Sequence, residues 1–420
     1  MRFSQLVAFR YLHASRENRY FSWITLLSLL GLAIGVAALI VVLSVINGFE
    51  YELRNRFLQA NAHIMAYRYP AGMVNPDKWA SMIMKDKDFA EDVQGISPFV
   101  HYETMAKNEN VMQGVLVRGI DPIKREKVQS IASLIDPPNA LSVLQKEIED
   151  KAKGKPEPEI PSVIIGIGLM ETLKSKIGGT IHLVAPSENN RFSDMKRFKI
   201  AGTYNSGLKH YDNRLIILSL TTAQSFFNMK DTVTGIEIGL KDADLSPEVA
   251  RKMEQKYELS FREWQSYNRP LFEAMERERF VIAIIVAMVV IVAGFNILTT
   301  VFVSVSQRQR DISILKALGS TNGQIMKLFL IQSSCIGFGG AALGVVLAGM
   351  ISFVLERYPF IDLPEPYFLK SLPVHYSLPV YATVCLAAIA ICLLAGLYPA
   401  FIASRVTPTE GIGGIGAAIT

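Results

Sequence analysis

Residues 280–307 read FVIAIIVAMVVIVAGFNILTTVFVSVSQ, an apolar run that contains no Asp, Glu, Lys or Arg. A helix needs about 20 mainly apolar residues to cross the hydrocarbon core of a bilayer. Windows with the same property occupy residues 21–46, 328–355 and 376–404. A buried helix of a soluble protein would explain one such window, but not four in one chain. The sequence therefore predicts a membrane protein with four transmembrane helices.

The positive charge of the chain is concentrated in three short parts. Residues 1–20, 307–327 and 404–420 together contain nine basic and three acidic residues, whereas residues 47–279 contain 32 of each. Short loops rich in Lys and Arg remain in the cytoplasm. We therefore expect both termini in the cytoplasm and the large domain outside it. A neutral exported domain also argues against nucleic-acid binding, which requires a basic patch.

The exported segment alternates between strand and helix patterns. Runs such as VMQGVLVRGI, SVIIGIG and RLIILSL are typical of strands, whereas PDKWASMIMKD and SPEVARKMEQKY are typical of helices. The predicted fold class is thus a four-helix membrane protein with a large α+β domain between the first two spans. All three cysteines lie inside predicted spans, so we expect no disulfide and no thiolate metal site in the exported domain.

The segment boundaries follow from these patterns. Gly31 and Gly35 in the first span, and Gly340 and Gly344 in the third, also provide flat faces for close helix packing. The N-terminal segment suits either a helix lying on the lipid surface or a frayed terminus. The prediction comprises that segment at 1–20, transmembrane helices at 21–46, 280–306, 324–355 and 378–403, the α+β domain at 47–279, a cytoplasmic helix at 307–323, an exported loop at 356–377 and a cytoplasmic tail at 404–420.

The helical pattern of FREWQSYNRPLFEAMERERFVIAII, residues 261–285, runs directly into the second span. A continuous helix across the membrane surface could carry motion from the spans to the exported domain. A rigid stalk without a mechanical role fits the pattern equally well.

Motifs for an energy source are missing from the chain. GTYNSGLK, residues 202–209, has Leu208 where a phosphate-binding loop requires lysine, and GIGGIG near the C-terminus lacks a preceding strand. The histidines lack zinc-ligand spacing, no serine occupies a nucleophile elbow, and no span carries a charged residue for ion coupling. We therefore expect no catalytic residue, metal site or cofactor in this chain. A transporter built on it would need a separate source of energy.

The loop RQRDISILKALGSTNGQI, residues 308–325, has the features of a short helix. Asp311 stands in its first turn, Lys316 in its last, and Gly319 follows as a C-cap. Thr321 and Gln324 have the spacing of a capping box that starts the next helix. An apolar stripe at Ile312, Leu315 and Leu318 could lie on lipid or fit a groove on a cytoplasmic protein.

Three blocks resemble a known family, the MacB-type ABC permeases. SQRQRDISILKALGSTNGQIMKLFLIQ looks like their coupling-helix segment, and LYPAFIASRVTPTEG resembles their closing block. Asn47, Gly48, Phe49 and Glu50 match the end of the first span in the lipoprotein-releasing (Lol) branch, the LolC/LolE family. The resemblance covers the chain in layout and is weakest in the exported domain, and the glycine-rich tail departs from the family pattern.

This resemblance implies an inner-membrane permease of a Gram-negative cell with a periplasmic α+β domain. A second permease subunit, identical or related (LolC/LolE-like), would complete the channel. A separate LolD-like ATPase would bind ATP and Mg²⁺ and press on the coupling helices. An acylated lipoprotein would then pass to a LolA-like periplasmic chaperone. MacB-like efflux, and FtsX-like signalling that activates a cell-wall hydrolase without transport, remain alternatives.

The resemblance also assigns candidate sites. The ATPase-coupling residues are Arg308, Arg310, Asp311, Ile312, Leu315, Lys316, Leu318 and Gly319. The lipoprotein-binding residues are Val42, Val45, Ile46, Asn47 and Phe49 in the first span and Phe280, Ile284 and Met288 in the second. The chaperone-binding residues are Arg191, Phe192, Met195, Lys196 and Arg197, although their loop lacks the second proline of the family's chaperone hook.

Overall fold

The computed structural model describes residues 19–68, 72–185, 195–266, 269–358 and 372–407. The chain divides into two compact units. The helical unit comprises residues 1–51, 274–363 and 370–420, and the α+β unit comprises residues 52–273 and 364–369. Residues 1–18 of the predicted N-terminal segment at 1–20 lie outside the described residues, as does the end of the tail, whereas Arg19 and Tyr20 begin the first long helix.

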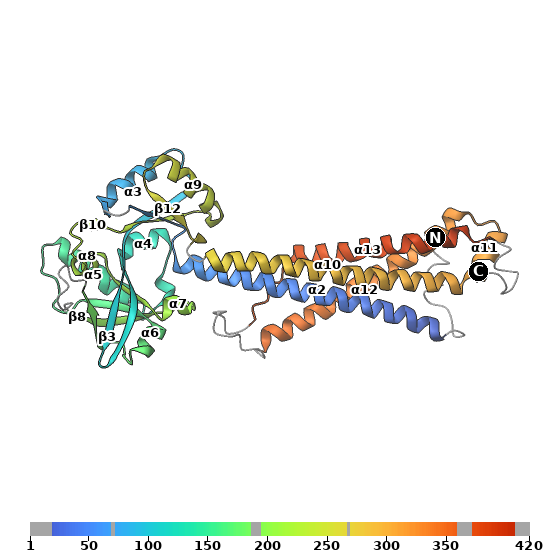
Figure 1. Cartoon of the computed structure of the whole chain (residues 1–420), viewed down its shortest axis with the longest axis horizontal. Helices are drawn as coiled ribbons and strands as arrows, with labels where there is room; N and C mark the ends of the chain where they lie inside the picture. The colour runs from blue at the N-terminus through green and yellow to red at the C-terminus, as the bar shows by residue number, and fades with distance from the viewer. Residues whose placement is uncertain (1–18, 69–71, 186–194, 267–268, 359–371, 408–420) are drawn as a thin grey trace. The chain divides into compact units, whose positions relative to one another are not determined.

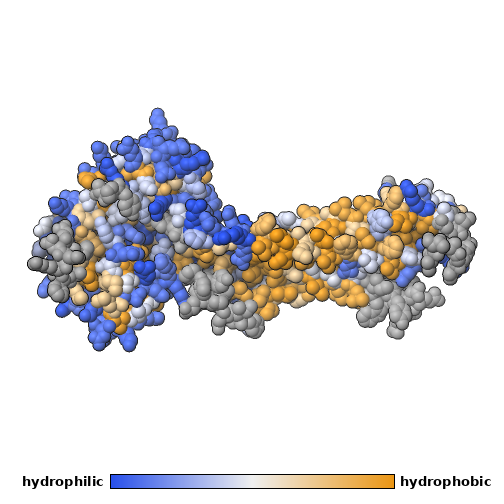
Figure 2. All heavy atoms as spheres, viewed as in Figure 1, coloured by the Kyte–Doolittle hydropathy of each residue, from blue (hydrophilic) through white to orange (hydrophobic). Residues whose placement is uncertain are grey.

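Four helices in the described residues are long and apolar enough to cross a membrane. They are α2 (Arg19–Ala60), α10 (Arg269–Gln307), α12 (Asn322–Arg357) and α13 (Leu378–Arg405) (Figure 1). Each contains one of the four predicted transmembrane helices, at 21–46, 280–306, 324–355 and 378–403, so this prediction is confirmed. In Figure 2 these helices are coloured largely hydrophobic, whereas the surface of the α+β unit is mainly hydrophilic.

Two helices extend well beyond their apolar windows. α2 continues past the predicted end of the first span to Ala60, and α10 begins at Arg269, eleven residues before Phe280. The expected continuous helix into the second span is therefore present. Its start was placed too early, because residues Ser260–Glu263 form strand β12.

Glycines allow α12 to pack closely on α2. A methyl group placed on Gly340 would lie 2.5 Å from Leu32 Cδ2, and one on Gly344 would lie 2.7 Å from Val36 Cβ. Small residues at such contacts let helix backbones approach each other in a membrane. The predicted role of this glycine pair is confirmed. Gly35, in contrast, has no atom within 4 Å of such a methyl group.

The α+β unit is built on a ten-stranded sheet with the order β12-β1-β11-β3-β4-β9-β6-β8-β5, in which β7 pairs with β3 and β8. Strands β2 and β10 form a separate two-stranded sheet. A long antiparallel hairpin, β3 and β4, forms its centre, in register from Phe99 opposite Ile120 to Asn108 opposite Val111. The strands are β1 (Ile64–Tyr67), β2 (Met73–Val74), β3 (Val93–Asn108), β4 (Val111–Ile120), β5 (Ile135–Asp136), β6 (Ser162–Gly166), β7 (Thr180–Val184), β8 (Met195–Tyr204), β9 (Leu215–Ser219), β10 (Thr232–Val233), β11 (Gly235–Leu240) and β12 (Ser260–Glu263).

Short helices bury the apolar faces of this sheet. α3 (Pro76–Lys85) and α9 (Ser246–Lys256) share a core with β1 and β11, and α5 (Ala140–Ala152) shares another with β6 and β9. A third core contains residues of α6 (Ile167–Thr172) and α8 (Leu220–Phe226). The remaining α-helices described in this unit are α4 (Pro122–Val128) and α7 (Lys209–Asp212), and two 3-10 helices lie at Ala132–Leu134 and Ala243–Leu245. The predicted α+β class of this domain is confirmed.

Candidate functional site

A short helix, α11 (Gln309–Ala317), joins α10 to α12. Asp311 lies in its first turn and Lys316 in its last, where each complements the helix dipole. Gly319 follows with φ 94°, a left-handed conformation that favours glycine. Gln324 Oε1 accepts a hydrogen bond of 2.9 Å from Thr321 N in the capping box that starts α12. The predicted order of helix, stop and restart is confirmed.

Two of the three residues of the apolar stripe of α11 pack on the helical bundle itself. Ile312 is only 1% exposed and lies in one core with Ala400, Ala403 and Val406, and Leu315 is half-buried against the same core. For Ile312 and Leu315 this corrects the expectation that the stripe faces lipid or a partner groove, because their neighbour is the end of α13. Leu318, the third member of the stripe, is 79% exposed.

Polar contacts fix α11 to the end of α13. Lys316 Nζ donates to the Ser404 carbonyl over 2.6 Å, and Ser313 Oγ donates to the Thr407 carbonyl over 3.2 Å. Of the predicted coupling residues, Arg308 at the N-cap is half-buried, whereas Arg310, Asp311, Leu318 and Gly319 are exposed. We name the exposed residues Arg310, Asp311, Ile314 and Leu318 the coupling surface.

Uncharged polar side chains connect the helices at the α11 end of the bundle. Ser28 Oγ bonds to Thr300 Oγ1, and Gln332 Nε2 donates to Ser304 Oγ over 3.1 Å. These four residues, which we name the inner joint, join α2 to α10 and α10 to α12. Hydrogen bonds between helices within a membrane contribute roughly 0.6–1.7 kcal/mol each. The joint therefore restrains separation of the helices at this end.

An apolar cavity of about 200 Å³ lies between α2, α10 and α13. Thr383 is its only hydroxyl-bearing lining residue, and its Oγ1 donates to the Pro379 carbonyl of its own helix over 2.7 Å. A cavity without free polar groups stays dry and suits an apolar ligand. Its walls are Leu32, Gly35, Val36, Leu39 and Leu43 of α2, Val286, Val289, Val290 and Ala293 of α10, and Thr383, Val384, Ala387, Ala388 and Ile391 of α13.

None of the predicted lipoprotein-binding residues lines this cavity. Val42, Phe280, Ile284 and Met288 are exposed on the bundle surface, and Val45, Ile46, Asn47 and Phe49 are half-buried. The cavity is lined instead by their near neighbours on the same helices. The cavity and the predicted residues share α2 and α10, whereas α13 carries none of the predicted residues. The role of the eight predicted residues stays a prediction.

The block around Gly48 makes contacts at the other end of the bundle. A methyl group on Gly48 would lie 2.3 Å from the Pro373 carbonyl oxygen, so glycine is needed for this close approach. Glu50 Oε2 lies 2.5 Å from Arg279 Nη2 of α10. The Tyr51 ring stacks on His375 with 4.8 Å between the ring centroids. This block therefore holds α2 against both α10 and the 372–377 segment.

The chaperone-binding prediction falls partly outside the described residues, which exclude Arg191 and Phe192. Met195 and Arg197 are exposed at the start of β8, and Met195 keeps 48% of its surface accessible. Lys196 is half-buried, and its Nζ lies 3.6 Å from Glu157 Oε2. The described part of this set is thus accessible to a partner protein.

A buried charge network in the α+β unit was not found from the sequence. Glu237 of β11 is fully buried and forms ion pairs with Arg118 of β4 and with Arg125 of α4. The Arg125 Nε to Glu237 Oε2 distance is 2.9 Å, and Arg125 Nη1 also donates to the Gln129 carbonyl over 2.7 Å. The network therefore links α4 to β4 and β11, the two strands that flank β3.

His101 of β3 lies beside this network, opposite Arg118 in the hairpin. Burial and the charge of Arg118 lower the pKa of His101 to about 4. In the unfolded chain this imidazole takes up a proton near pH 6.5. Protonation of His101 therefore favours the unfolded state. The contribution of neutral His101 to the free energy of unfolding is complete above about pH 6.5 and is lost as the pH falls towards 4.

We expect the parent chain to lose up to about 3 kcal/mol of stability from this group between pH 6.5 and 4. The His101→Gln variant should lose less stability than the parent between pH 6.5 and 4. The His210→Gln variant, changed at an exposed position, should lose as much as the parent. Asp212 and Glu263 act in the opposite direction because burial raises the pKa of each carboxyl group. The measurement is the free energy of unfolding in urea at each pH, and the quantity to compare is its difference between each variant and the parent chain. Parallel pH profiles for His101→Gln and the parent would contradict the assignment.

In the parts of the chain that the structure describes, no group of three or more His, Cys, Asp or Glu side chains could hold a metal ion. The helical unit brings together a helix that packs on its own bundle, an exposed surface on that helix, and an apolar cavity.

Comparisons with known proteins match nearly the whole length of the chain. The MacB-like periplasmic core domain matches residues 25–256, and the FtsX-like permease C-terminal matches residues 283–408. The lipoprotein-releasing system transmembrane protein LolC of Neisseria meningitidis is 30% identical over 97% of this chain and 98% of its own length. LolC of Xylella fastidiosa is 28% identical, covering 97% and 98% of the two chains, and LolE of Haemophilus influenzae is also 28% identical, covering 96% and 97%.

Proposed function

Because the chain belongs to the LolC/LolE family of lipoprotein-releasing ABC permeases, we propose that it extracts acylated lipoproteins from the inner membrane for transfer to a periplasmic chaperone. The dry cavity between α2, α10 and α13 is the observation that carries this proposal. It offers an acyl chain a hydrocarbon environment within the permease. Relative to water, each methylene buried there contributes about 0.8 kcal/mol, whereas transfer from the lipid hydrocarbon is nearly neutral.

The drive for extraction comes from a separate ATPase that binds ATP and Mg²⁺ and docks on the coupling surface. A second permease subunit, identical or related, completes the complex. Both termini and α11 lie in the cytoplasm in this arrangement, in agreement with the distribution of basic residues. The contacts of Lys316 with Ser404 and of Ile312 with the α13 core support a path by which pressure on α11 moves α13.

Purification of the complex with its co-expressed ATPase, followed by mass spectrometry of the bound molecules, tests the function. We expect triacylated proteins to co-purify and lipoproteins to accumulate in the inner membrane after depletion of the chain. A complex without acylated protein, together with normal lipoprotein sorting after depletion, would refute the proposal. A bound peptide or drug would favour efflux, and a bound cell-wall hydrolase would favour signalling.

Ala387→Phe tests the cavity as the acyl site. The ring would occupy the space of at least two methylenes, so we expect retention of a fluorescent triacylated lipopeptide to fall about tenfold. Ala390→Phe is the matched control, because Ala390 is exposed on the same helix and does not line the cavity. Equal retention by both variants would show that acyl chains bind elsewhere.

A further inference from the structure

Gly35 of α2 does not make the close helix contact that its spacing predicts. Its backbone is helical, and among the described residues no atom lies within 4 Å of a methyl group placed on it. Glycine inside a helix is less favourable than alanine, so neither packing nor backbone conformation explains this residue. Gly35 lines the apolar cavity. What its missing side chain leaves is cavity volume.

The cavity is closed at the end nearer α11 by two close contacts of α10. A methyl group on Gly31 of α2 would lie 2.7 Å from Asn296 Nδ2 of α10. A methyl group on Gly294 of α10 would lie 3.3 Å from Ile391 Cγ2 of α13. Gly31 and Gly294 each stand next in sequence to a lining residue. The cavity therefore ends at this level, which we name the inner end.

The wall of α2 at the inner end is tightly packed from behind. Leu32 and Val36 line the cavity and are buried. A methyl group on Gly340 of α12 would lie 2.5 Å from Leu32 Cδ2, and one on Gly344 would lie 2.7 Å from Val36 Cβ. Densely packed side chains leave little room for displacement. The inner end therefore cannot recede to admit a longer ligand.

The cavity runs along the bundle axis away from the inner end. Its lining residues on α2 extend from Leu32 to Leu43, a distance of about 16 Å at about 1.5 Å per residue. Gly35 lies about 12 Å from Leu43 on the same scale. Thr383 and Ala387 of α13, which also line the cavity, are exposed, whereas Leu32 is buried. A ligand therefore reaches the cavity at positions away from the inner end.

These lengths can be compared with those of acyl chains. An extended chain advances about 1.2 Å per bond, since three backbone bonds of a polypeptide span about 3.3–3.6 Å. A palmitoyl chain is therefore about 18 Å long and an octanoyl chain about 8 Å. The polar part of an acylated protein is disfavoured among apolar side chains, so it stays near Leu43. From there a palmitoyl chain reaches Gly35, and an octanoyl chain ends before it.

We propose that Gly35 sets the length of acyl chain that the cavity accepts. The terminal methylenes of a long chain occupy the space beside Gly35, and the closed inner end limits the buried part of the chain to about 16 Å. Carbons beyond that length remain outside with the polar group. This inference rests on the proposed function, since it assigns chain-length selectivity to the same cavity.

Gly35→Leu tests this role through chain length. The complex with its ATPase is titrated in detergent with two fluorescent triacylated lipopeptides, one with palmitoyl and one with octanoyl chains. We expect the Kd of the palmitoyl lipopeptide to rise about tenfold, the usual scale of overpacking, and that of the octanoyl lipopeptide to stay within about twofold of the parent. Gly349→Leu in α12 is the matched control, because a methyl group on Gly349 meets no described atom within 4 Å and Gly349 does not line the cavity.

The pattern across the two lipopeptides separates this inference from the proposed function. If a folded Gly35→Leu complex loses affinity for both lipopeptides equally, or binds the palmitoyl lipopeptide as tightly as the parent, the length assignment is overturned and the proposed function stands. If the parent complex binds neither lipopeptide, the proposed function fails and the length assignment fails with it.

Two further variants keep the test decisive if Gly35→Leu does not fold. Ala293→Leu adds carbons to the same end of the cavity from α10, and it should weaken binding of the palmitoyl lipopeptide alone. Equal weakening of both lipopeptides by this variant would overturn the inference. Gly35→Ala should melt no lower than the parent, because its methyl group meets no described atom and alanine favours the helix. A lower melting temperature would show that Gly35 serves packing instead.

Discussion

Glu237→Gln is expected to lower the free energy of unfolding of the α+β unit by about 3–5 kcal/mol, because loss of one partner leaves buried charge uncompensated. Glu237 and Arg125 are 0% and 1% exposed, and Arg118 is 7% exposed. Glutamine fills the same space but cannot neutralise two guanidinium groups. The effect should therefore exceed that of any single change at the surface.

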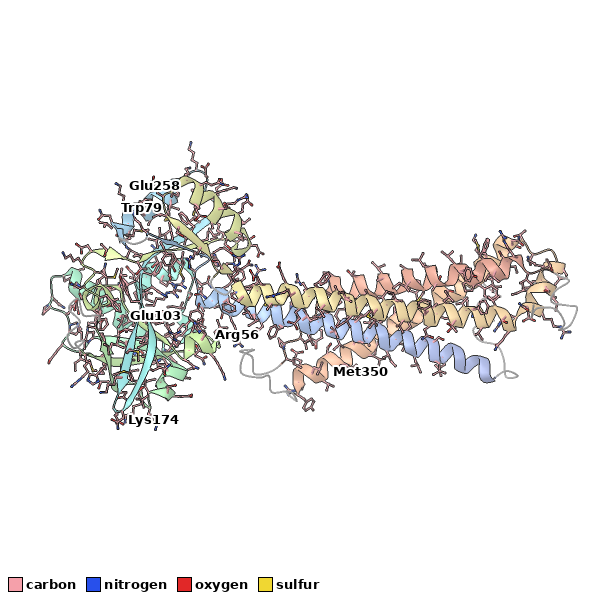
Figure 3. The ribbon with its side chains drawn as sticks, viewed as in Figure 1. Arg56, Trp79, Glu103, Lys174, Glu258 and Met350 are labelled. Atoms are coloured by element: carbon pink, nitrogen blue, oxygen red, sulfur yellow. The ribbon has the colours of Figure 1, made fainter. Side chains whose placement is uncertain are left out.

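Unfolding of the full-length chain in detergent, followed by tryptophan fluorescence, measures this loss. Trp79, labelled in Figure 3, and the buried Trp264 both report on the α+β unit. Glu248→Gln is the matched control, since Glu248 pairs with Lys252 at an exposed helix surface, where such pairs contribute less than about 1 kcal/mol. A loss below about 1 kcal/mol for Glu237→Gln would mean that the network is not needed for stability.

The pair Ile314→Asp and Leu318→Asp is expected to weaken ATPase binding at least 100-fold, roughly 2.7 kcal/mol. Both side chains are apolar and exposed, at 44% and 79% of their surface, so two carboxylates there would remain unpaired inside a docked interface. The contacts of Ile312 and Lys316 within the helical unit would stay intact, and the fold should not change.

Affinity of the purified ATPase for the permease in detergent is the measurement. Leu378→Asp is the matched control, because Leu378 is 81% exposed at the opposite end of the bundle and should leave binding unchanged. Leu315 is unsuitable for such a test, since it is half-buried against the core and its replacement would disturb the fold. Binding within threefold of the parent would contradict the assignment of the coupling surface.

The sequence was sufficient to predict a structural feature wherever a local pattern of residues is compatible with one kind of structure. Long uncharged runs can only be accommodated in a membrane or a core, so the four spans were predictable. Gly319 and the Thr321–Gln324 capping box depend on neighbouring residues alone, and both were placed correctly. The α+β class likewise followed from the alternation of strand and helix periods.

The sequence was insufficient wherever the answer depends on which surface a residue meets. Ile312 has the same spacing whether its neighbour is α13 or a partner protein, and only the fold shows that it is α13. α10 is apolar all round, so its pattern cannot separate Met288 on the surface from Val289 in the cavity. Glu237 and Arg118 lie 119 positions apart, and no periodicity connects them.

The polar groups of the inner joint are all uncharged, and so are the residues of the four apolar windows. Moving one elementary charge through 100 mV involves about 2.3 kcal/mol. Helices that carry no charge within the hydrocarbon core exchange no such energy with the membrane potential as they separate. Separation of these four apolar windows would therefore move no side-chain charge through the hydrocarbon core, and we expect that step to be insensitive to the membrane potential.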